Sequence, residues 1–144
     1  MGKNAQERGN PRRTRIEQRR AEGVAVAVAR NIRVSPLKLR RIIDLIRGKD
    51  YPEALAILNF TPSPSVEPVR KVLQSAAANA ENNLSLDPDR LYVKTCYVDA
   101  GLSFKRMHPT TMGRARVIRR RSSHITVLVA ERARARTARA AAAG

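Results

Sequence analysis

The chemistry that this sequence suggests is the binding of a polyanion, and it is concentrated in one stretch. Between Asp99 and Glu131 the chain carries no carboxylate. The stretch carries seven basic side chains: Lys105, Arg106, Arg114, Arg116, Arg119, Arg120 and Arg121. Repulsion among these cations would penalise a compact fold of the segment on its own. We therefore expect phosphate groups to neutralise it, as they do when Lys and Arg side chains bind a nucleic acid.

The charge of the whole chain points the same way. It has 144 residues, with 29 Lys and Arg against 12 Asp and Glu, and a formal net charge of +17. A balance this basic favours nucleic acid or an anionic membrane surface as the partner. No apolar run approaches the roughly 18 to 20 residues that span a bilayer, and the N-terminus lacks the apolar region of a signal peptide. We expect a soluble, intracellular protein without a membrane partner.

The charge is unevenly distributed, and this predicts the domain organisation. Residues 24–130 form the predicted single α+β domain, because one modest hydrophobic core is the default at this length. Residues 1–23 read as a basic arm that is disordered when free and that contributes Arg12 and Arg13 to RNA binding. Residues 131–144 form an Ala/Arg-rich tail, which is too short for a stable isolated helix.

Catalysis is not expected from this set of residues. An enzyme needs converging acids, bases, nucleophiles or a metal, and the most unusual stretch of the chain has no carboxylate. His108 and His124 are the only histidines and Cys96 is the only cysteine, so the chain offers no familiar zinc site. Cys96 reads as a small core residue on a strand. No metal or cofactor is expected.

Three segments alternate in the manner of β-strands. In the first, Val24, Val26 and Val28 alternate with alanines, and the pattern continues to Val34. The others are Arg90 to Asp99 and His124 to Ala130. The two dozen residues between them are far more than a hairpin turn needs, and loops of that size are usually functional or disordered. We predict an extended β-hairpin over residues 100–123 that projects beyond the core.

Three helices are predicted from caps and apolar periodicity. Ser35 and Pro36 start a helix that runs to Arg47, and Gly48 supplies the left-handed residue that ends it. Asp50 is the predicted cap of a short second helix through Asn59. Ser65 is the predicted cap of a third helix, with Pro68 in its first turn. This third helix has a narrow apolar stripe: Val69, Val72, Leu73, Ala76 and Ala80.

The way in which the chain recognises a nucleic acid is indicated by its low aromatic content. Aromatic residues make up 3% of the chain and Trp is absent. No strand has the repeated aromatic platform that stacks single-stranded bases. The cations are spread over a loop, a helix face and both tails, whereas a groove reader concentrates its base contacts in one helix. The pattern favours recognition of backbone and shape within a folded RNA.

Several spaced motifs together resemble a known family. They are Arg33-Val34-Ser35-Pro36 with Lys38, Ile46-Arg47-Gly48-Lys49, Ala76 through Asn79-Ala80-Glu81-Asn82, Val98-Asp99, Lys105-Arg106, Pro109, Gly113-Arg114-Ala115 and Ser123-His124-Ile125-Thr126-Val127. In this order the motifs resemble large-subunit ribosomal protein twenty-two, of bacterial or organellar type. The match covers about residues 24–131, and the two tails fall outside it.

The resemblance implies an architecture and a location in the ribosome. It implies three helices packed against a three-stranded antiparallel sheet, with a long protruding β-hairpin. It also implies a structural constituent of the large ribosomal subunit that binds ribosomal RNA, supports assembly and extends the hairpin to the wall of the nascent-peptide exit tunnel. The implied partners are large-subunit ribosomal RNA, neighbouring ribosomal proteins and the nascent peptide, in the cytoplasm or an organelle. No homo-oligomer is expected.

The residues and the resemblance together assign the site. We expect the RNA contacts at Arg12, Arg13, Arg33, Ser35, Lys38, Arg41, Lys105, Arg106, Arg114, Arg116, Arg119, Arg120, Arg121, Ser123 and His124. We expect the tunnel-facing hairpin tip at Met107, His108, Pro109, Thr110, Thr111, Met112 and Gly113. The alternative function is that of a DNA-binding, nucleoid-type protein. A cationic membrane-surface protein is a weaker alternative, because no helix pairs basic residues with a broad, bulky apolar face.

Overall fold

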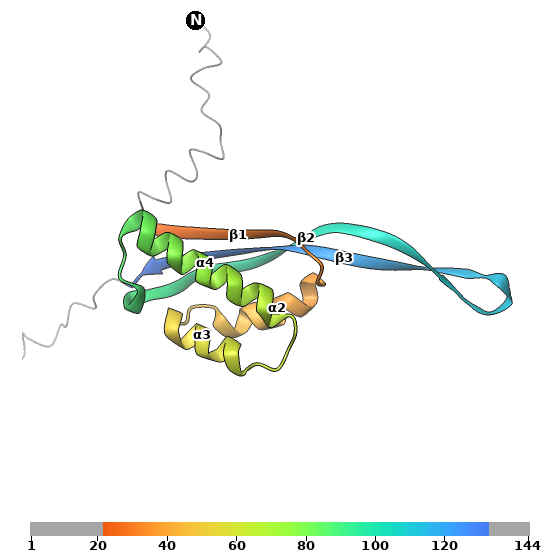
Figure 1. Cartoon of the computed structure of the whole chain (residues 1–144), viewed down its shortest axis with the longest axis horizontal. Helices are drawn as coiled ribbons and strands as arrows, with labels where there is room; N and C mark the ends of the chain where they lie inside the picture. The colour runs from red at the N-terminus through yellow and green to blue at the C-terminus, as the bar shows by residue number, and fades with distance from the viewer. Residues whose placement is uncertain (1–21, 133–144) are drawn as a thin grey trace, which may run out of the picture.

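The computed structural model describes residues 22–132 (Figure 1). Its elements, in chain order, are β1 (Val24–Ile32), α2 (Pro36–Ile46), α3 (Tyr51–Phe60), α4 (Val66–Leu84), the 3-10 turn η2 (Pro88–Arg90), β2 (Leu91–Pro109), the 3-10 turn η3 (Thr111–Gly113) and β3 (Ala115–Glu131). The predicted basic arm with Arg12 and Arg13, and most of the predicted C-terminal tail, lie outside the described residues.

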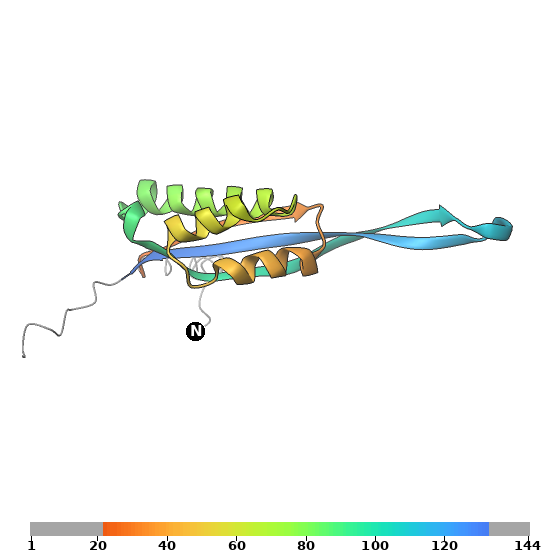
Figure 2. The ribbon, with the colours of Figure 1, turned by 90° about the horizontal axis from the view of Figure 1, so that it is seen from below.

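The strands form one antiparallel sheet in the order β1-β3-β2, so the last strand lies in the middle. All three helices cover the same face of the sheet. Helix α4 lies along β1 and β3, and α2 lies along β2 (Figure 2). The predicted α+β class, with three helices on a three-stranded antiparallel sheet, is confirmed.

The core lies between the helices and one face of the sheet. Helix α2 contributes Leu39, Ile42, Ile43 and Ile46, which share one face and are buried, as their spacing predicts. The five residues of the predicted α4 stripe are also buried. They meet the inward side chains of β3: Ile125, Val127 and Val129. Burial of these apolar side chains is the main stabilising contribution to the domain.

The helices begin where the sequence predicts, but not through the predicted caps. Ser35, Asp50 and Ser65 each occupy the N-cap position, and none of their side chains makes a capping hydrogen bond. Asp50 instead pairs with Arg132, at 3.1 Å. Proline in the first turn and the packing of the apolar faces therefore define these helix starts. Gly48 is left-handed as predicted, with a φ of +74°, but α2 already ends at Ile46, because the backbone of Arg47 is extended.

The inward side of β2 changes phase partway along the strand. Leu91 and Val93 face the core, and then Cys96 and Val98 do. The simple alternation expected from the sequence fails because a β-bulge shifts the register between Val93 and Thr95. Cys96 is buried as predicted, and burial raises the pKa of its thiol.

The hairpin leaves the domain at a second bulge of β2. Gly101 and Leu102 together lie opposite Ser122, because the register shifts between Ala100 and Ser103. The Ser122 hydroxyl donates a hydrogen bond to the Leu102 carbonyl at 2.7 Å. From there β2 and β3 stay paired as far as Pro109 and Ala115, well beyond the helices (Figures 1 and 2). The predicted projecting hairpin is confirmed.

We predict that Gly101→Ala destabilises the base of the hairpin. An added Cβ would stand 2.7 Å from the Ser122 Oγ and 3.1 Å from its carbonyl carbon, so the bulge would have to shift. Overpacking of this kind costs about 1–3 kcal/mol. Urea unfolding would measure the loss of free energy, and Ser122→Ala in the same chain should recover part of it, since the closest clash is with the hydroxyl. Wild-type stability of Gly101→Ala would contradict this account of the bulge.

Candidate nucleic-acid interface

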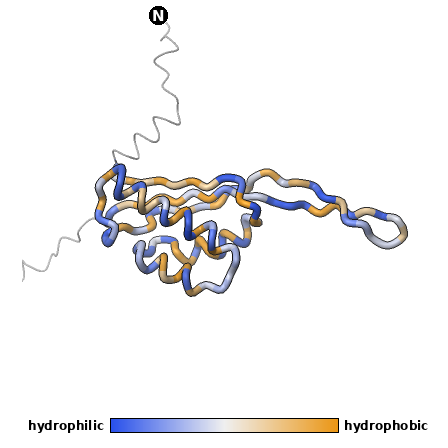
Figure 3. The backbone as a smooth tube through the Cα atoms, viewed as in Figure 1, coloured by the Kyte–Doolittle hydropathy of each residue, from blue (hydrophilic) through white to orange (hydrophobic). Residues whose placement is uncertain are grey.

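The candidate interface begins with the two legs of the hairpin. Their seven basic side chains are all exposed. Lys105 lies directly opposite Arg119, and like charges in that position repel. Apolar residues are interspersed among the basic ones along both legs, as the colouring of the tube in Figure 3 shows. None of the helices that the structure describes covers either face of this ladder (Figure 2).

The carboxylates of the described residues do not neutralise the hairpin. The ion pairs within residues 22–132 lie in the helices and at the far end of the sheet. They join Asp44 to Arg47, Glu53 to Lys49, Glu67 to Arg70 and Lys71, Glu131 to Arg90, and Asp50 to Arg132. The domain therefore pairs much of its own charge, whereas its projecting part carries unpaired cations in the described chain.

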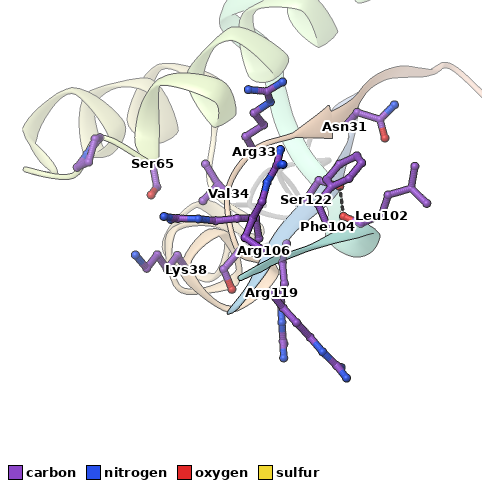
Figure 4. A pocket seen from close by; sticks show the side chains of 14 residues that line it. Asn31, Arg33, Val34, Lys38, Ser65, Leu102, Phe104, Arg106, Arg119 and Ser122 are labelled. Carbon is purple, nitrogen blue, oxygen red and sulfur yellow. Dashed lines mark hydrogen bonds between the residues drawn. The ribbon is translucent and has the colours of Figure 1, made fainter. Parts of the chain in front are cut away.

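A basic groove lies at the root of the hairpin and has a volume of about 1150 Å³. Four segments meet there: the end of β1, the start of α2, the loop before α4 and the hairpin legs. The lining residues are Asn31, Arg33, Val34, Ser35, Lys38, Pro64, Ser65, Leu102, Phe104, Arg106, Arg119, Arg120, Arg121 and Ser122. None of them is acidic. In Figure 4, Lys38 and Ser65 lie on one side of this basic groove, and Leu102 and Phe104 lie on the other.

The start of α2 adds to the attraction for anions. Its first turn contains no acidic residue, and Lys38 follows two positions after the first helical residue. The Ser35 hydroxyl makes no capping bond, so it remains available for a ligand. The N-terminus of a helix carries a partial positive charge and outward N–H groups. Together with Arg33 from the preceding segment, this end of the helix suits a phosphate.

Most of the predicted contact residues are gathered by the fold. Arg33, Ser35 and Lys38 share the basic groove with four hairpin cations: Arg106, Arg119, Arg120 and Arg121. Arg41 lies exposed on α2, beyond the groove lining. Lys105, Arg114 and Arg116 are exposed farther along the hairpin.

Ser123 and His124 make hydrogen bonds within the fold. Ser123 is fully buried and its hydroxyl donates a hydrogen bond to the Val34 carbonyl at 2.9 Å. It is therefore out of reach of RNA, contrary to the sequence-based prediction. His124 is half-buried, and its Nδ1 accepts a hydrogen bond from the Asn31 N–H at 3.0 Å. Both side chains hold the connection between β1 and α2, which forms one wall of the groove.

The turn of the hairpin is shorter than the predicted tip. Met107, His108 and Pro109 are still paired with β3. The chain reverses after them, where both the N–H and the hydroxyl of Thr110 donate hydrogen bonds to the Arg114 carbonyl at 2.8 Å. Met112 adopts a left-handed conformation, with a φ of 61°. Thr111 and Met112 are thus the most distal part of the tip, together with Gly113.

Three residues that line the groove could not be assigned to it from the sequence. Asn31, Pro64 and Ser65 line it because of the bulge in β1 and the course of the loop before α4.

Within residues 22–132 no group of acidic, His and Cys side chains is placed to hold a metal ion. In the same part of the chain, no helix combines the length and the apolar character needed to cross a membrane.

The family model described as ribosomal protein L22p/L17e matches residues 27–130. The protein named large ribosomal subunit protein uL22 of Desulfitobacterium hafniense (strain Y51) is 58% identical over 108 residues, which cover 75% of this chain and 95% of the relative. The protein of the same name from Pelotomaculum thermopropionicum is 57% identical over 108 residues, with 75% and 96% covered. That of Heliobacterium modesticaldum is 56% identical, with 75% and 77% covered.

We predict that the combined substitution Arg119→Gln, Arg120→Gln and Arg121→Gln makes RNA binding much less dependent on salt. Each lost phosphate contact should reduce the slope of log affinity against log salt concentration, by about 2 to 3 in all. Filter binding to a short RNA duplex between 50 and 300 mM KCl would measure this slope.

The matched control removes three cations that are paired within the domain: Lys49→Gln, Arg70→Gln and Lys71→Gln. It lowers the net charge by the same amount, and the slope should stay close to that of the wild type. Equal slopes for the two triple variants would show that net charge, rather than the basic groove, governs the binding.

Proposed function

The chain belongs to the ribosomal protein L22p/L17e family, and we propose that it binds large-subunit ribosomal RNA through the basic groove and the hairpin legs. It is a structural constituent of the large ribosomal subunit and not an enzyme. As its named relatives are bacterial, it is placed in the cytoplasm, on the ribosome. Family membership favours this function over that of a DNA-binding nucleoid protein.

The observation that carries the proposal is the separation of charge within the fold. The seven hairpin cations are exposed and face no carboxylate of residues 22–132, whereas the described ion pairs lie in the domain. Phosphates of several RNA segments are the natural counterions for such a projection. By offsetting the repulsion where these segments converge, the protein would support assembly of the subunit.

The RNA is recognised mainly by its backbone and its shape. The groove cations come from α2, from the segment before it and from both hairpin legs. Such an arrangement contacts several strands from different directions, and none of the helices in residues 22–132 is presented in the manner of a recognition helix. Neighbouring ribosomal proteins would meet the remaining exposed surface of the domain.

We further propose that the tip of the hairpin lies in the wall of the nascent-peptide exit tunnel. The support is the length of the paired legs and the chemistry of the turn. Thr110, Thr111 and Met112 are exposed and uncharged, in contrast to the basic legs. Legs held by RNA would fix the turn in place, and an uncharged tip could touch a passing peptide without binding it strongly. The nascent chain is therefore the expected partner of the tip.

We predict that a photoreactive amino acid at Thr111 crosslinks to a nascent peptide. Ribosomes that carry the substituted protein would be stalled on a message encoding a radiolabelled chain, and crosslinked products would be separated by gel electrophoresis. The same amino acid at Lys94, which is exposed on the domain, is the control and should give no peptide product. Absence of a product from Thr111, or equal products from both positions, would defeat the tunnel assignment.

A further inference from the structure

We propose that the basic groove holds one unpaired nucleobase of the RNA against the ring of Phe104. This inference rests on the proposed RNA-binding function and names the kind of nucleotide that the groove accepts. Most of the interface contacts the RNA backbone, and Phe104 adds a single stacking site to it.

Phe104 is an exposed aromatic residue in a cationic setting. Its side chain is 56% exposed, although it lines a groove that also contains six basic side chains. They are Arg33, Lys38, Arg106, Arg119, Arg120 and Arg121. Leu102, Val34 and Pro64 contribute apolar surface to the same groove. Apolar and cationic groups thus face one ligand, which must offer both a flat apolar surface and negative charge.

No arginine of residues 22–132 covers the ring of Phe104. Phe104 lies opposite Arg120 in the ladder, and Arg106 is two residues along the same strand. In residues 22–132, however, the cation–π contact is that of Arg132 over Tyr92, at 5.4 Å. The ring therefore remains open for a base, and the nearby guanidinium groups remain open for phosphates.

The groove has the size and the polar groups that a nucleotide requires. Its volume of about 1150 Å³ exceeds the roughly 300–1,000 Å³ of typical ligand pockets, which leaves room for a base and its flanking phosphates. The side chains of Asn31 and Ser35 line the groove and make no hydrogen bond to other side chains or backbone groups of the described residues. An amide and a hydroxyl in this position can bond to the edge of a base.

An unpaired nucleotide fits this combination better than a duplex or a protein segment. Bases within a duplex are stacked, and the major groove of A-form RNA is too narrow for side chains to read. Loop and bulge nucleotides are instead splayed out and stack on aromatic side chains or on arginines. An apolar protein segment would bury Phe104 but leave six cations without counterions, which is unfavourable.

The first test compares two RNA probes that differ by one nucleotide. One is a stem with a single unpaired adenosine, and the other is the same stem fully paired. Phe104→Ala in the full-length chain should weaken binding of the bulged stem by about 5- to 150-fold, the range for loss of one stacked base. Binding of the paired stem should stay the same, and Phe104→Tyr should restore binding of the bulged stem. Phe60→Ala, at an exposed phenylalanine on α3, is the matched control and should bind like the wild type.

The second test uses large subunits assembled with each variant. Acylation of the ribose 2′-hydroxyls reports on nucleotides that become free to move. In subunits with Phe104→Ala, one unpaired nucleotide should gain reactivity several-fold, and subunits with Phe60→Ala should match the wild type. Circular dichroism and urea unfolding of the free variants would verify that folding is intact, as expected for exposed side chains.

The outcomes separate this inference from the proposed function. Salt-dependent binding of both stems, with no effect of Phe104→Ala on either, would overturn the stacking site and leave the RNA-binding function intact. Failure of the wild-type protein to bind either stem or ribosomal RNA would overturn both. In the assembled subunits, unchanged reactivity of every nucleotide with Phe104→Ala would also overturn the inference.

Discussion

The proposed function depends on electrostatic attraction between the projecting hairpin and the phosphates of an RNA. The hairpin consists of two strands whose hydrogen bonds join them only to each other, and none of the helices in residues 22–132 packs on either of its faces. A two-stranded ribbon in water is marginally stable at best. Seven cations without a carboxylate reduce its stability further. Bound phosphates would stabilise the ribbon, because each one replaces repulsion between cations with attraction.

The domain defines the position and direction of the hairpin. Side chains of the helical layer bond to carbonyls on both outer strands: Arg40 of α2 and Arg47, directly after α2, donate hydrogen bonds to the Val98 and Cys96 carbonyls of β2, and Asn79 of α4 donates one to the Val26 carbonyl of β1. These bonds tie the helices to the sheet. At the hairpin end, bulges in β1 and β2 lie on either side of the central strand, so the direction of the hairpin is defined by backbone geometry.

Much of this fold could be predicted from local patterns. The face of α2, the left-handed Gly48 after it and the projecting hairpin follow from periodicity, glycine placement and loop length. The burial of Ser123 and the change of phase in β2 could not be predicted, since they depend on long-range register. The absence of side-chain capping at the helix starts could not be predicted either. Asp50, for example, pairs with Arg132, which is distant in the sequence. The basic groove itself joins four segments, and only some of its residues carry a charge that marks them in the sequence.

Amide hydrogen exchange along the hairpin tests the electrostatic account most directly. The exchange rates of residues 103–120 would be compared in the free protein at low ionic strength and in the assembled large subunit. The account predicts fast exchange in the free protein, with slow exchange in the core strands, and strong protection of the hairpin in the subunit. Equally slow exchange of the hairpin amides in the free protein, without any polynucleotide, would contradict it.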